Sequence, residues 1–285
     1  MAIMPSYFFL NTDSPMPELP EVETTLRGIA PHVLGRKLSA LVVRQPRLRW
    51  PIPDELSAQI TGQKLVNAYR RGKYLLLEFT TGTALIHLGM SGSLRITDAK
   101  APPLTHDHFD LVFGTTLVRY CDPRRFGCLL WIEGEAQQHP LLNHLGPEPL
   151  GEEFTADYLY QRSRKRSQAI KQFIMDSKIV VGVGNIYANE SLFMSRIKPI
   201  RKAGSLTRAE CVRFVDAIRF VLQRSITQGG TTLRDFVGGD GKPGYFQQQL
   251  LVYGRGGQPC VECGKALKEV RMNDRTTVYC VDCQH

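Results

Sequence analysis

The sequence predicts an α+β protein of two domains: an antiparallel β-sandwich or barrel that carries a helix, followed by a mainly helical domain. Three observations support this prediction. Apolar and polar residues alternate in several segments of the first half, the apolar period becomes helical in the second half, and two Cys-x-x-Cys pairs lie near the end. The chain has 285 residues, which is enough for two hydrophobic cores.

The first half contains one short predicted helix followed by strands. Pro20 and Glu21 begin a helical pattern that runs towards Ile29. Several of the later segments alternate between apolar and polar side chains, as half-buried antiparallel strands do. The predicted strand segments, which Gly, Pro and Asp punctuate, are residues 37–45, 64–79, 83–96, 108–114 and 115–132.

The pattern changes beyond residues 145–154, LGPEPLGEEF, whose prolines and glycines predict a hinge between the domains. Residues 170–193 should form a helix, a turn and a second helix, with Gly182 and Gly184 in the turn. Asn185 would cap the second helix or help to seat a phosphate at its N-terminus. A further helix, ended by Gly229 and Gly230, is indicated by Phe214, Val215, Ile218, Val221 and Leu222.

Charge provides the first indication of function. The net charge is +9 and the isoelectric point is about 9.3. An excess of Lys and Arg attracts a phosphate backbone, although a merely basic protein is the alternative. No apolar run approaches the roughly 18 residues of a membrane span. No Lys or Arg precedes the short apolar patch near the N-terminus, which argues against a targeting signal. We therefore expect a cytoplasmic protein without a membrane partner, and we expect it to be a monomer.

Four of the seven cysteines form two pairs near the C-terminus. Sixteen residues separate Cys260-x-x-Cys263 from Cys280-x-x-Cys283. Two thiolate pairs across such a hairpin can close a tetrahedral site, which predicts one structural Zn²⁺ rather than disulfides or redox pairs. So small a module has too little core to fold alone, and zinc would stabilise it. The cations between the pairs, which form either a phosphate-binding or a solvated face, are Lys265, Lys268, Arg271 and Arg275.

The stretch MPELPEVETT places Pro17 directly after a methionine that could start translation. If synthesis starts at Met16 and that residue is removed, Pro17 becomes an N-terminal secondary amine. An α-amino group has a pKa near 8, against about 10.4 for lysine, so far more of it is neutral at pH 7. Such an amine can attack a sugar C1′, and the resulting iminium ion acidifies the adjacent C2′ proton.

Several motifs, in order, resemble those of bacterial formamidopyrimidine-DNA glycosylase: PELPEVET, RRGKYLLLEF, HLGMSGSLR, DPRRFG, LGPEPL, VGVGNIYANESLF, GGTTLRDFVGGDGKPGYF and the four-cysteine module. The resemblance covers Met16 to His285. It implies an α+β fold with an N-terminal antiparallel β-sandwich with helices and a C-terminal helix–two-turns–helix domain plus a β-hairpin zinc finger. It also implies an enzyme that excises oxidised purines, chiefly 8-oxoguanine and formamidopyrimidines, from double-stranded DNA and cleaves the abasic site by β,δ-elimination.

The resemblance also implies roles for individual residues. Pro17 would be the Schiff-base nucleophile and Glu18 its acid and base, with Glu21 in support. By position alone, Glu21 and Glu23 could instead complement the positive end of the helix, and for Glu23 we prefer this interpretation. Thr231 to Tyr245 would form a loop over the everted base. The remaining implied residues are Lys73 and Arg275 in elimination, His106, Arg124 and Arg166 on DNA, Lys171 and Asn185 on phosphates, and Met90, Arg124 and Phe126 in the gap left by the base.

The predicted domain boundaries are 1–15 for an extension absent from the mature enzyme, 16–146 for the sandwich, 147–250 for the helical domain with its capping loop, and 251–285 for the zinc finger. If residues 1–15 stayed attached, Pro17 would be an internal amide without a nucleophilic nitrogen. Two other functions remain open at this point. One is a sibling glycosylase for oxidised pyrimidines, and the other is a non-catalytic DNA-binding zinc protein.

Overall fold

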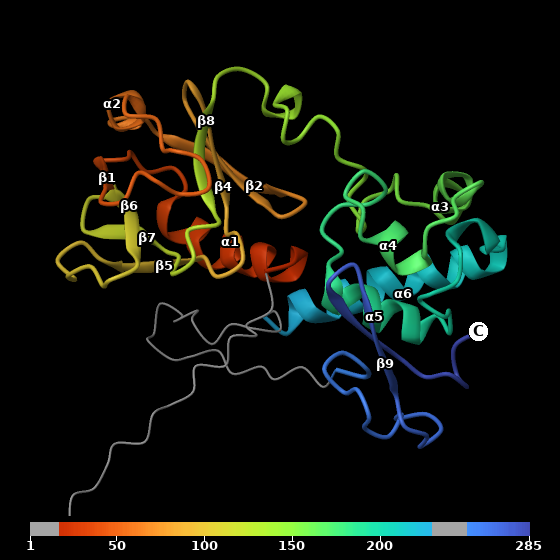
Figure 1. Cartoon of the computed structure of the whole chain (residues 1–285). Helices are drawn as coiled ribbons and strands as arrows, with labels where there is room; N and C mark the ends of the chain where they lie inside the picture. Colours follow the sequence, from red (N-terminus) through yellow and green to blue (C-terminus); the bar gives the residue numbers. More distant parts are fainter. Residues whose placement is uncertain (1–16, 230–249) are drawn as a thin grey trace, which may run out of the picture.

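The computed structural model describes residues 17–229 and 250–285 and shows two lobes joined by one extended connection (Figure 1). The N-terminal lobe comprises residues 17–132, and the C-terminal lobe comprises residues 156–229 and 250–285. The predicted extension at 1–15 and the predicted capping loop at 231–245 lie outside the described residues. No helix in the described part of the chain is long and apolar enough to cross a membrane.

The elements follow one another along the chain in the order that Figure 1 labels. The N-terminal lobe holds α1 (Leu19–Val33), β1 (Ala40–Val43), α2 (Leu56–Ile60), β2 (Leu65–Arg71), β3 (Tyr74–Phe79), β4 (Gly82–His87), β5 (Ser93–Asp98), β6 (Asp107–Phe113), β7 (Thr116–Cys121) and β8 (Cys128–Ile132). The connection and the C-terminal lobe hold η1 (Ala136–Gln138), α3 (Ala156–Ser163), α4 (Ile170–Ile174), α5 (Asn185–Met194), η2 (Ala203–Ser205), α6 (Arg208–Thr227), β9 (Lys268–Met272) and β10 (Arg275–Tyr279).

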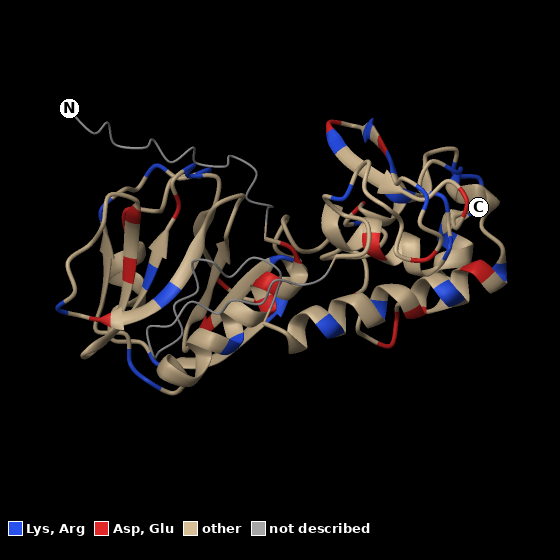
Figure 2. Ribbon diagram, turned by 90° about the horizontal axis from the view of Figure 1, so that it is seen from below, with Lys and Arg blue, Asp and Glu red and all other residues tan. Residues whose placement is uncertain are grey.

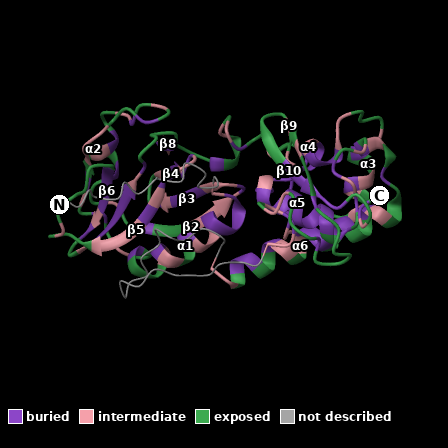
Figure 3. Ribbon diagram, turned by 60° about the horizontal axis from the view of Figure 1, so that its bottom comes forward, coloured by how far each residue is buried: buried purple, intermediate pink, exposed green. Residues whose placement is uncertain are grey.

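The N-terminal lobe is a sandwich of two antiparallel sheets. Their strand orders are β1-β6-β7-β5 and β2-β3-β4-β8. Apolar residues of both sheets, such as Phe109 and Leu75, form one buried cluster with Leu26 of α1. The core therefore lies between the sheets and extends under α1 (Figure 3), which confirms the predicted sandwich with its helix.

Three predicted strand segments contain two strands each. Residues 64–79 form β2 and β3, which meet at Gly72 in the left-handed region with φ of 57°. In residues 83–96 the chain crosses from one sheet to the other between β4 and β5, and in residues 115–132 it crosses back between β7 and β8. Residues 88–92 and 122–127 are thus two crossing turns between the sheets.

The C-terminal lobe buries its own apolar cluster, which includes Phe173, Ile186 and Phe214. The predicted helix–turn–helix at 170–193 is present as α4 and α5. Helix α6 begins after Thr207, whose hydroxyl accepts the Glu210 N–H, and Gly229 follows its end with φ of 86°. The expected glycine stop is therefore confirmed at Gly229.

The start of α1 joins the two lobes. Leu19 is fully buried in the C-terminal cluster, and its N–H donates to Gly182 O at 3.1 Å. The hinge segment is also tied to the sandwich, because the Glu148 carboxylate accepts Arg70 at 2.7 Å and the Gly72 N–H at 2.7 Å. Arg71 donates to the carbonyl oxygens of Leu145 and Gly146. These contacts hold the end of β2 against the connection.

Strands β9 and β10 form a hairpin at the end of the chain. Asn273 and Asp274 turn it with φ of 45° and 57°, as two-residue hairpin loops do. The hairpin packs on α5, where Asn189 Oδ1 accepts the Val278 N–H at 2.8 Å. Phe193 of α5 shares a small buried cluster with Val278 and two of the paired cysteines. The cysteine module therefore rests on the helical lobe.

Candidate active site and metal centre

Glu18 lies where the two lobes meet, directly after the half-buried Pro17 and before α1. Its carboxylate accepts the Gly184 N–H at 2.8 Å and the Ile186 N–H at 2.8 Å, at the first turn of α5. Gly184 is required for this approach, because a Cβ added there would lie 2.2 Å from Glu18 Cδ. The carboxylate of one lobe thus satisfies the free N–H groups of a helix in the other.

Burial raises the pKa of Glu18 to about 7, although the nearby Lys73 ammonium opposes the rise. The Glu21 charge raises it further, and the N–H groups of Ile186 and Tyr187 lower it. A carboxyl group with this pKa can both give and take a proton near neutral pH. The site therefore holds an acid–base group beside Pro17.

A buried polar chain supports Glu18 from behind. Glu21 Oε2 accepts the Glu18 N–H at 3.0 Å, and Glu21 Oε1 accepts the Tyr187 hydroxyl at 2.7 Å. That hydroxyl also contacts Ser225 Oγ at 2.6 Å, which links α1, α5 and α6. Glu23 instead accepts Arg27 and Arg70, and its pKa is low because, despite partial burial, these guanidinium groups stabilise its charge.

Lys73 follows Gly72 in the turn between β2 and β3 and is half-buried. Burial lowers the pKa of Lys73, Glu18 opposes the fall, and Arg275 adds to it. Lys73 thus interacts electrostatically with both Glu18 of its own lobe and Arg275 of the hairpin. It lines a pocket of about 170 Å³ together with His87 and residues 180–183.

His87 in the same pocket was not identified from the sequence. Burial lowers the pKa of His87 to about 4, with Lys73 and Arg49 adding to the fall, so the ring is neutral at pH 7. Its Nδ1 accepts the Gly89 N–H at 2.9 Å, so its Nε2 carries the hydrogen and is available as a donor. An ammonium and an N–H donor in one pocket suit an anion.

Arg275 is exposed at the start of β10, on the tip of the hairpin. Lys171 is buried beside the same strand and is 2% exposed. The Lys171 Nζ donates to Thr276 O at 2.8 Å and to Thr277 Oγ1 at 2.6 Å, so in this structure its ammonium contacts the hairpin. Burial lowers the pKa of Lys171 to about 7, Arg275 adds to the fall, and Glu18 opposes it. Glu18 is thus close to one lysine of each lobe, Lys73 and Lys171.

The three predicted gap-filling residues lie on the two crossing turns of the sandwich. Met90 is half-buried in turn 88–92, while Arg124 and Phe126 are exposed in turn 122–127. The Arg124 guanidinium lies 5.1 Å from the centre of the Phe126 ring. The two turns are in contact, because a Cβ added at Gly89 would lie 2.5 Å from the Phe126 carbonyl carbon. The structure therefore brings these three residues onto one edge of the lobe.

The other predicted DNA-contacting residues are spread over both lobes. His106 is exposed before β6, and Arg166 is exposed in the loop after α3. Asn185 is the first residue of α5, whereas Gly184 holds the N-cap position, so the predicted Asn185 cap is wrong. The Glu18 carboxylate takes that role from 166 residues away in the sequence. Figure 2 shows Lys and Arg on both lobes and on the terminal hairpin.

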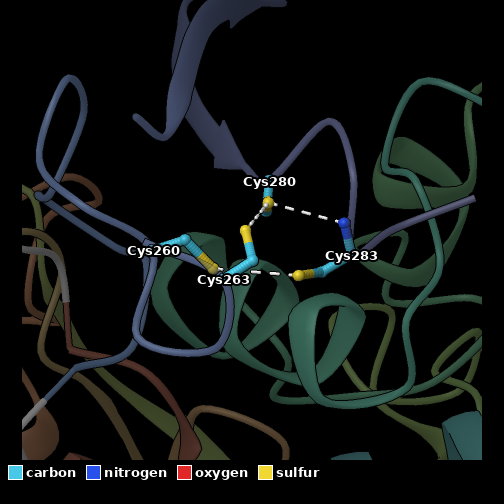
Figure 4. A group of neighbouring side chains, drawn as sticks. All are labelled: Cys260, Cys263, Cys280 and Cys283. Carbon is cyan, nitrogen blue, oxygen red and sulfur yellow. Dashed lines mark hydrogen bonds between the residues drawn. The ribbon is translucent and has the colours of Figure 1, made fainter. Parts of the chain in front are cut away.

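The four predicted zinc ligands converge (Figure 4). The sulfur atoms of Cys260, Cys263, Cys280 and Cys283 all lie within 4.8 Å of one another. The Cys263 and Cys280 sulfurs are 3.5 Å apart, and those of Cys260 and Cys283 are 4.0 Å apart. Ligands about 2.3 Å from a tetrahedral zinc ion are separated by about 3.8 Å, so this donor set fits one structural zinc.

The fold and the site define a two-lobed zinc-finger protein that brings a proline, a buried carboxyl group and several cations together where the lobes meet. Comparison with known families gives a more specific result. The formamidopyrimidine-DNA glycosylase N-terminal domain matches residues 16–129, the H2TH domain of that enzyme matches 145–237, and the zinc finger found in FPG and IleRS matches 257–285.

Individual relatives agree with these matches. The formamidopyrimidine-DNA glycosylase of Cellvibrio japonicus is 77% identical over 269 residues, which cover 94% of this chain and 100% of the relative. The crystal structure of the MutM (FPG) protein of Thermus thermophilus is similar with a TM-score of 0.82 and 39% identity, over 94% of this chain and 98% of that one. The chain belongs to the formamidopyrimidine-DNA glycosylase family.

A third relative was solved with DNA. The Lactococcus lactis Fpg in complex with DNA containing an abasic site is similar with a TM-score of 0.85 and 31% identity, over 94% of this chain and 99% of that one. The predicted family, the α+β fold class and the zinc finger are thereby confirmed. The roles of the individual site residues stay predictions.

Proposed function

We propose that this protein is a bifunctional enzyme that excises oxidised purines from double-stranded DNA and then cleaves the abasic site. The observation that carries the proposal is the buried Glu18 carboxyl group, with its pKa near 7, directly beside Pro17 and close to cations of both lobes. Family membership supports the substrate class, and the L. lactis relative bound to abasic DNA supports the second step.

The proposal requires Pro17 to be the first residue of the active protein. The family match begins at residue 16, and 94% of this chain spans the whole C. japonicus relative. Both facts support synthesis from Met16, or removal of the extension, followed by loss of that methionine. The Pro17 nitrogen would then be a secondary amine next to the acid–base group.

The chemistry follows from these two groups. The Pro17 lone pair attacks C1′, the bond from C1′ to the base breaks, and the base leaves with the electrons of that bond and takes up the proton released from the Pro17 nitrogen. Glu18 protonates the ring oxygen O4′, the ring opens, and an iminium ion forms. Loss of the C2′ proton to water then expels the 3′ phosphate, and a second elimination expels the 5′ phosphate. Water finally hydrolyses the remaining iminium ion, which releases the sugar fragment and restores the Pro17 amine. Lys73, which is close to both Glu18 and Arg275, assists these eliminations together with Arg275, and both hold the phosphates.

DNA binding would use the edge of both lobes that faces the site. His106 and Arg166 are exposed and would contact phosphates, as would Asn185 at the start of α5. The Lys171 ammonium gives two of its three hydrogens to the hairpin, which leaves the third for a phosphate. Met90, Arg124 and Phe126 would fill the gap left by the everted base, since a wedge restores lost stacking and a guanidinium can pair with the remaining base. The capping role of residues 231–245 stays a prediction.

The proposal is tested by borohydride trapping of protein that begins at Pro17, on a duplex with 8-oxoguanine opposite cytosine, followed by mass mapping. We expect one adduct on the Pro17 nitrogen. The matched control is protein that retains residues 1–16, because it has the same described lobes but an amide in place of the amine. It should bind the duplex without forming an adduct.

The other outcomes separate the alternatives. Salt-dependent binding without an adduct would indicate a DNA-binding zinc protein. An adduct mapped to Lys73 would contradict the proline mechanism. Efficient trapping on thymine glycol but not on 8-oxoguanine would assign the protein to the class that removes oxidised pyrimidines.

A further inference from the structure

Asp122, the first residue of the second crossing turn, has no role in the chemistry described above. It is fully buried, with 0% exposure, and both of its carboxylate oxygens are occupied. Oδ1 accepts the Ser91 hydroxyl at 2.6 Å and the Arg124 N–H at 3.2 Å. Oδ2 accepts the Tyr120 hydroxyl at 3.0 Å and the Gly127 N–H at 2.9 Å. These four donors fill the acceptor positions of one carboxylate.

Three of the four donors come from the two crossing turns, and the fourth, Tyr120, belongs to β7. Ser91 belongs to the turn that carries Met90, whereas Arg124 and Gly127 belong to the turn that carries Phe126. The main chain of Asp122 adds to the junction, because its N–H donates to His106 O at 3.0 Å. The carboxylate and the main chain of Asp122 together therefore connect the segments that hold Met90, Arg124, Phe126 and His106.

The packing at this junction leaves little room for another arrangement. A Cβ added at Gly127 would lie 1.8 Å from the Tyr120 hydroxyl oxygen, and one added at Gly92 would lie 2.1 Å from Leu88 O. Arg125 adopts φ of 56°, a left-handed conformation that persists only where the surroundings determine it. The exposed side chains of the two turns are thus attached to a tightly packed backbone.

We propose that Asp122 is a positioning residue that couples the two crossing turns, so that Met90, Arg124 and Phe126 enter the DNA together as one preformed wedge. The inference rests on the proposed function, since it concerns how that function reaches a stacked base. Preformed geometry matters here because the two turns lose their conformational entropy during folding, so base eversion does not have to order them. The coupling accelerates insertion and leaves the chemistry at C1′ unchanged.

Ser91→Ala tests the coupling with the smallest change, because it removes only the Ser91 hydroxyl, which donates to Asp122 Oδ1 at 2.6 Å and accepts the Arg124 N–H at 3.3 Å. The matched control is Ser93→Ala, two residues along, since no hydrogen bond of the Ser93 hydroxyl is recorded within residues 17–229 and 250–285. Two reactions are compared under single-turnover conditions: excision of 8-oxoguanine opposite cytosine, and cleavage of a duplex with a preformed abasic site. A 2-aminopurine beside the lesion reports insertion.

We expect Ser91→Ala to slow both insertion and excision by about tenfold, the order of effect of a hydrogen bond to a charged group. Cleavage of the abasic duplex, which has no base to evert, should stay within about twofold. Ser93→Ala should match the wild type in both reactions. Asp122→Asn should slow excision further, because an amide offers one acceptor oxygen where the carboxylate offers two. Combining it with Ser91→Ala should add little, as expected for two parts of one contact.

Three results would overturn the inference. Ser91→Ala could leave both reactions unchanged, it could slow both equally, or its effect could add fully to that of Asp122→Asn. The test with Ser91→Ala stands alone if Asp122→Asn does not fold. Failure of the proposed function is distinguishable, because the wild-type protein would then process neither duplex, and the inference would fall with it.

Discussion

Gly184→Ala provides the sharpest test of how Glu18 is held. The added Cβ would lie 2.2 Å from Glu18 Cδ and 2.4 Å from Glu18 Oε1, well inside van der Waals contact. Gly184 has φ of -114°, which any residue adopts, so the substitution introduces no backbone strain. Its effect must therefore come from displacement of the carboxylate. Contact distances of about 3.5 Å require a shift of more than about 1 Å.

The size of the effect follows from the bonds that are lost. The carboxylate accepts the N–H groups of Gly184 and Ile186, each at 2.8 Å, and a hydrogen bond to a charged group contributes about 1.5–3 kcal/mol. A catalytic group misplaced by about 1 Å typically costs about 10²-fold in rate. We therefore expect excision to slow about 100-fold, which corresponds to about 2.7 kcal/mol of activation free energy.

The assay is single-turnover excision of 8-oxoguanine by protein that begins at Pro17, with circular dichroism to verify folding. Gly151→Ala is the matched control, because the nearest atom to its added Cβ is 3.3 Å away and belongs to Glu148, so the added Cβ does not displace Glu18. It should retain wild-type activity. If folded Gly184→Ala excised within about threefold of the wild type, the position of Glu18 would not matter for catalysis, and its assignment as the acid would be refuted.

Three further predictions concern protonation and zinc. The logarithm of the excision rate should rise with pH below about 7, because the Pro17 amine, with a pKa near 8, must lose its proton. It should fall above about 8, because Glu18, with a pKa of about 7, must keep its proton. Glu18→Gln should excise slowly at every pH, and its pH profile should lack the falling limb. Lys73→Met should move the lower break of the profile, near pH 7, to higher pH, because that break follows the pKa of Glu18 when Pro17 has the higher pKa, and the Lys73 charge lowers the pKa of Glu18; an unmoved break would count against their proximity. Cys263→Ser should lose zinc, measured by metal analysis, and lower strand cleavage at least about 100-fold by releasing the hairpin that carries Arg275, while Cys121→Ser, outside the cysteine cluster, should do neither.

Local motifs predicted more of this protein than periodicity did. The zinc ligands follow from spacing alone, because the two cysteine pairs are each local and a hairpin brings them together. The strand breaks at Gly72 and at the two crossing turns were missed, since apolar alternation continues through segments that change sheets. The predicted Asn185 cap failed for a related reason. The N–H groups of α5 are satisfied by Glu18, and no local pattern indicates a partner so far away in the chain.

Helix α5 connects the Glu18 carboxylate to the terminal hairpin. Eight of its ten residues are buried, so it has no solvated face and no amphipathic period. Its N-terminus holds Glu18, its Asn189 accepts the Val278 N–H of the hairpin, and its Glu190 accepts the N–H groups of residues 251–253. One helix thus sets the distance between the acid–base group and β10, the strand that begins at Arg275 and leads to Cys280. A polar side chain buried on such a helix has a positioning role that hydrophobic patterning cannot reveal, because its partners belong to other parts of the chain.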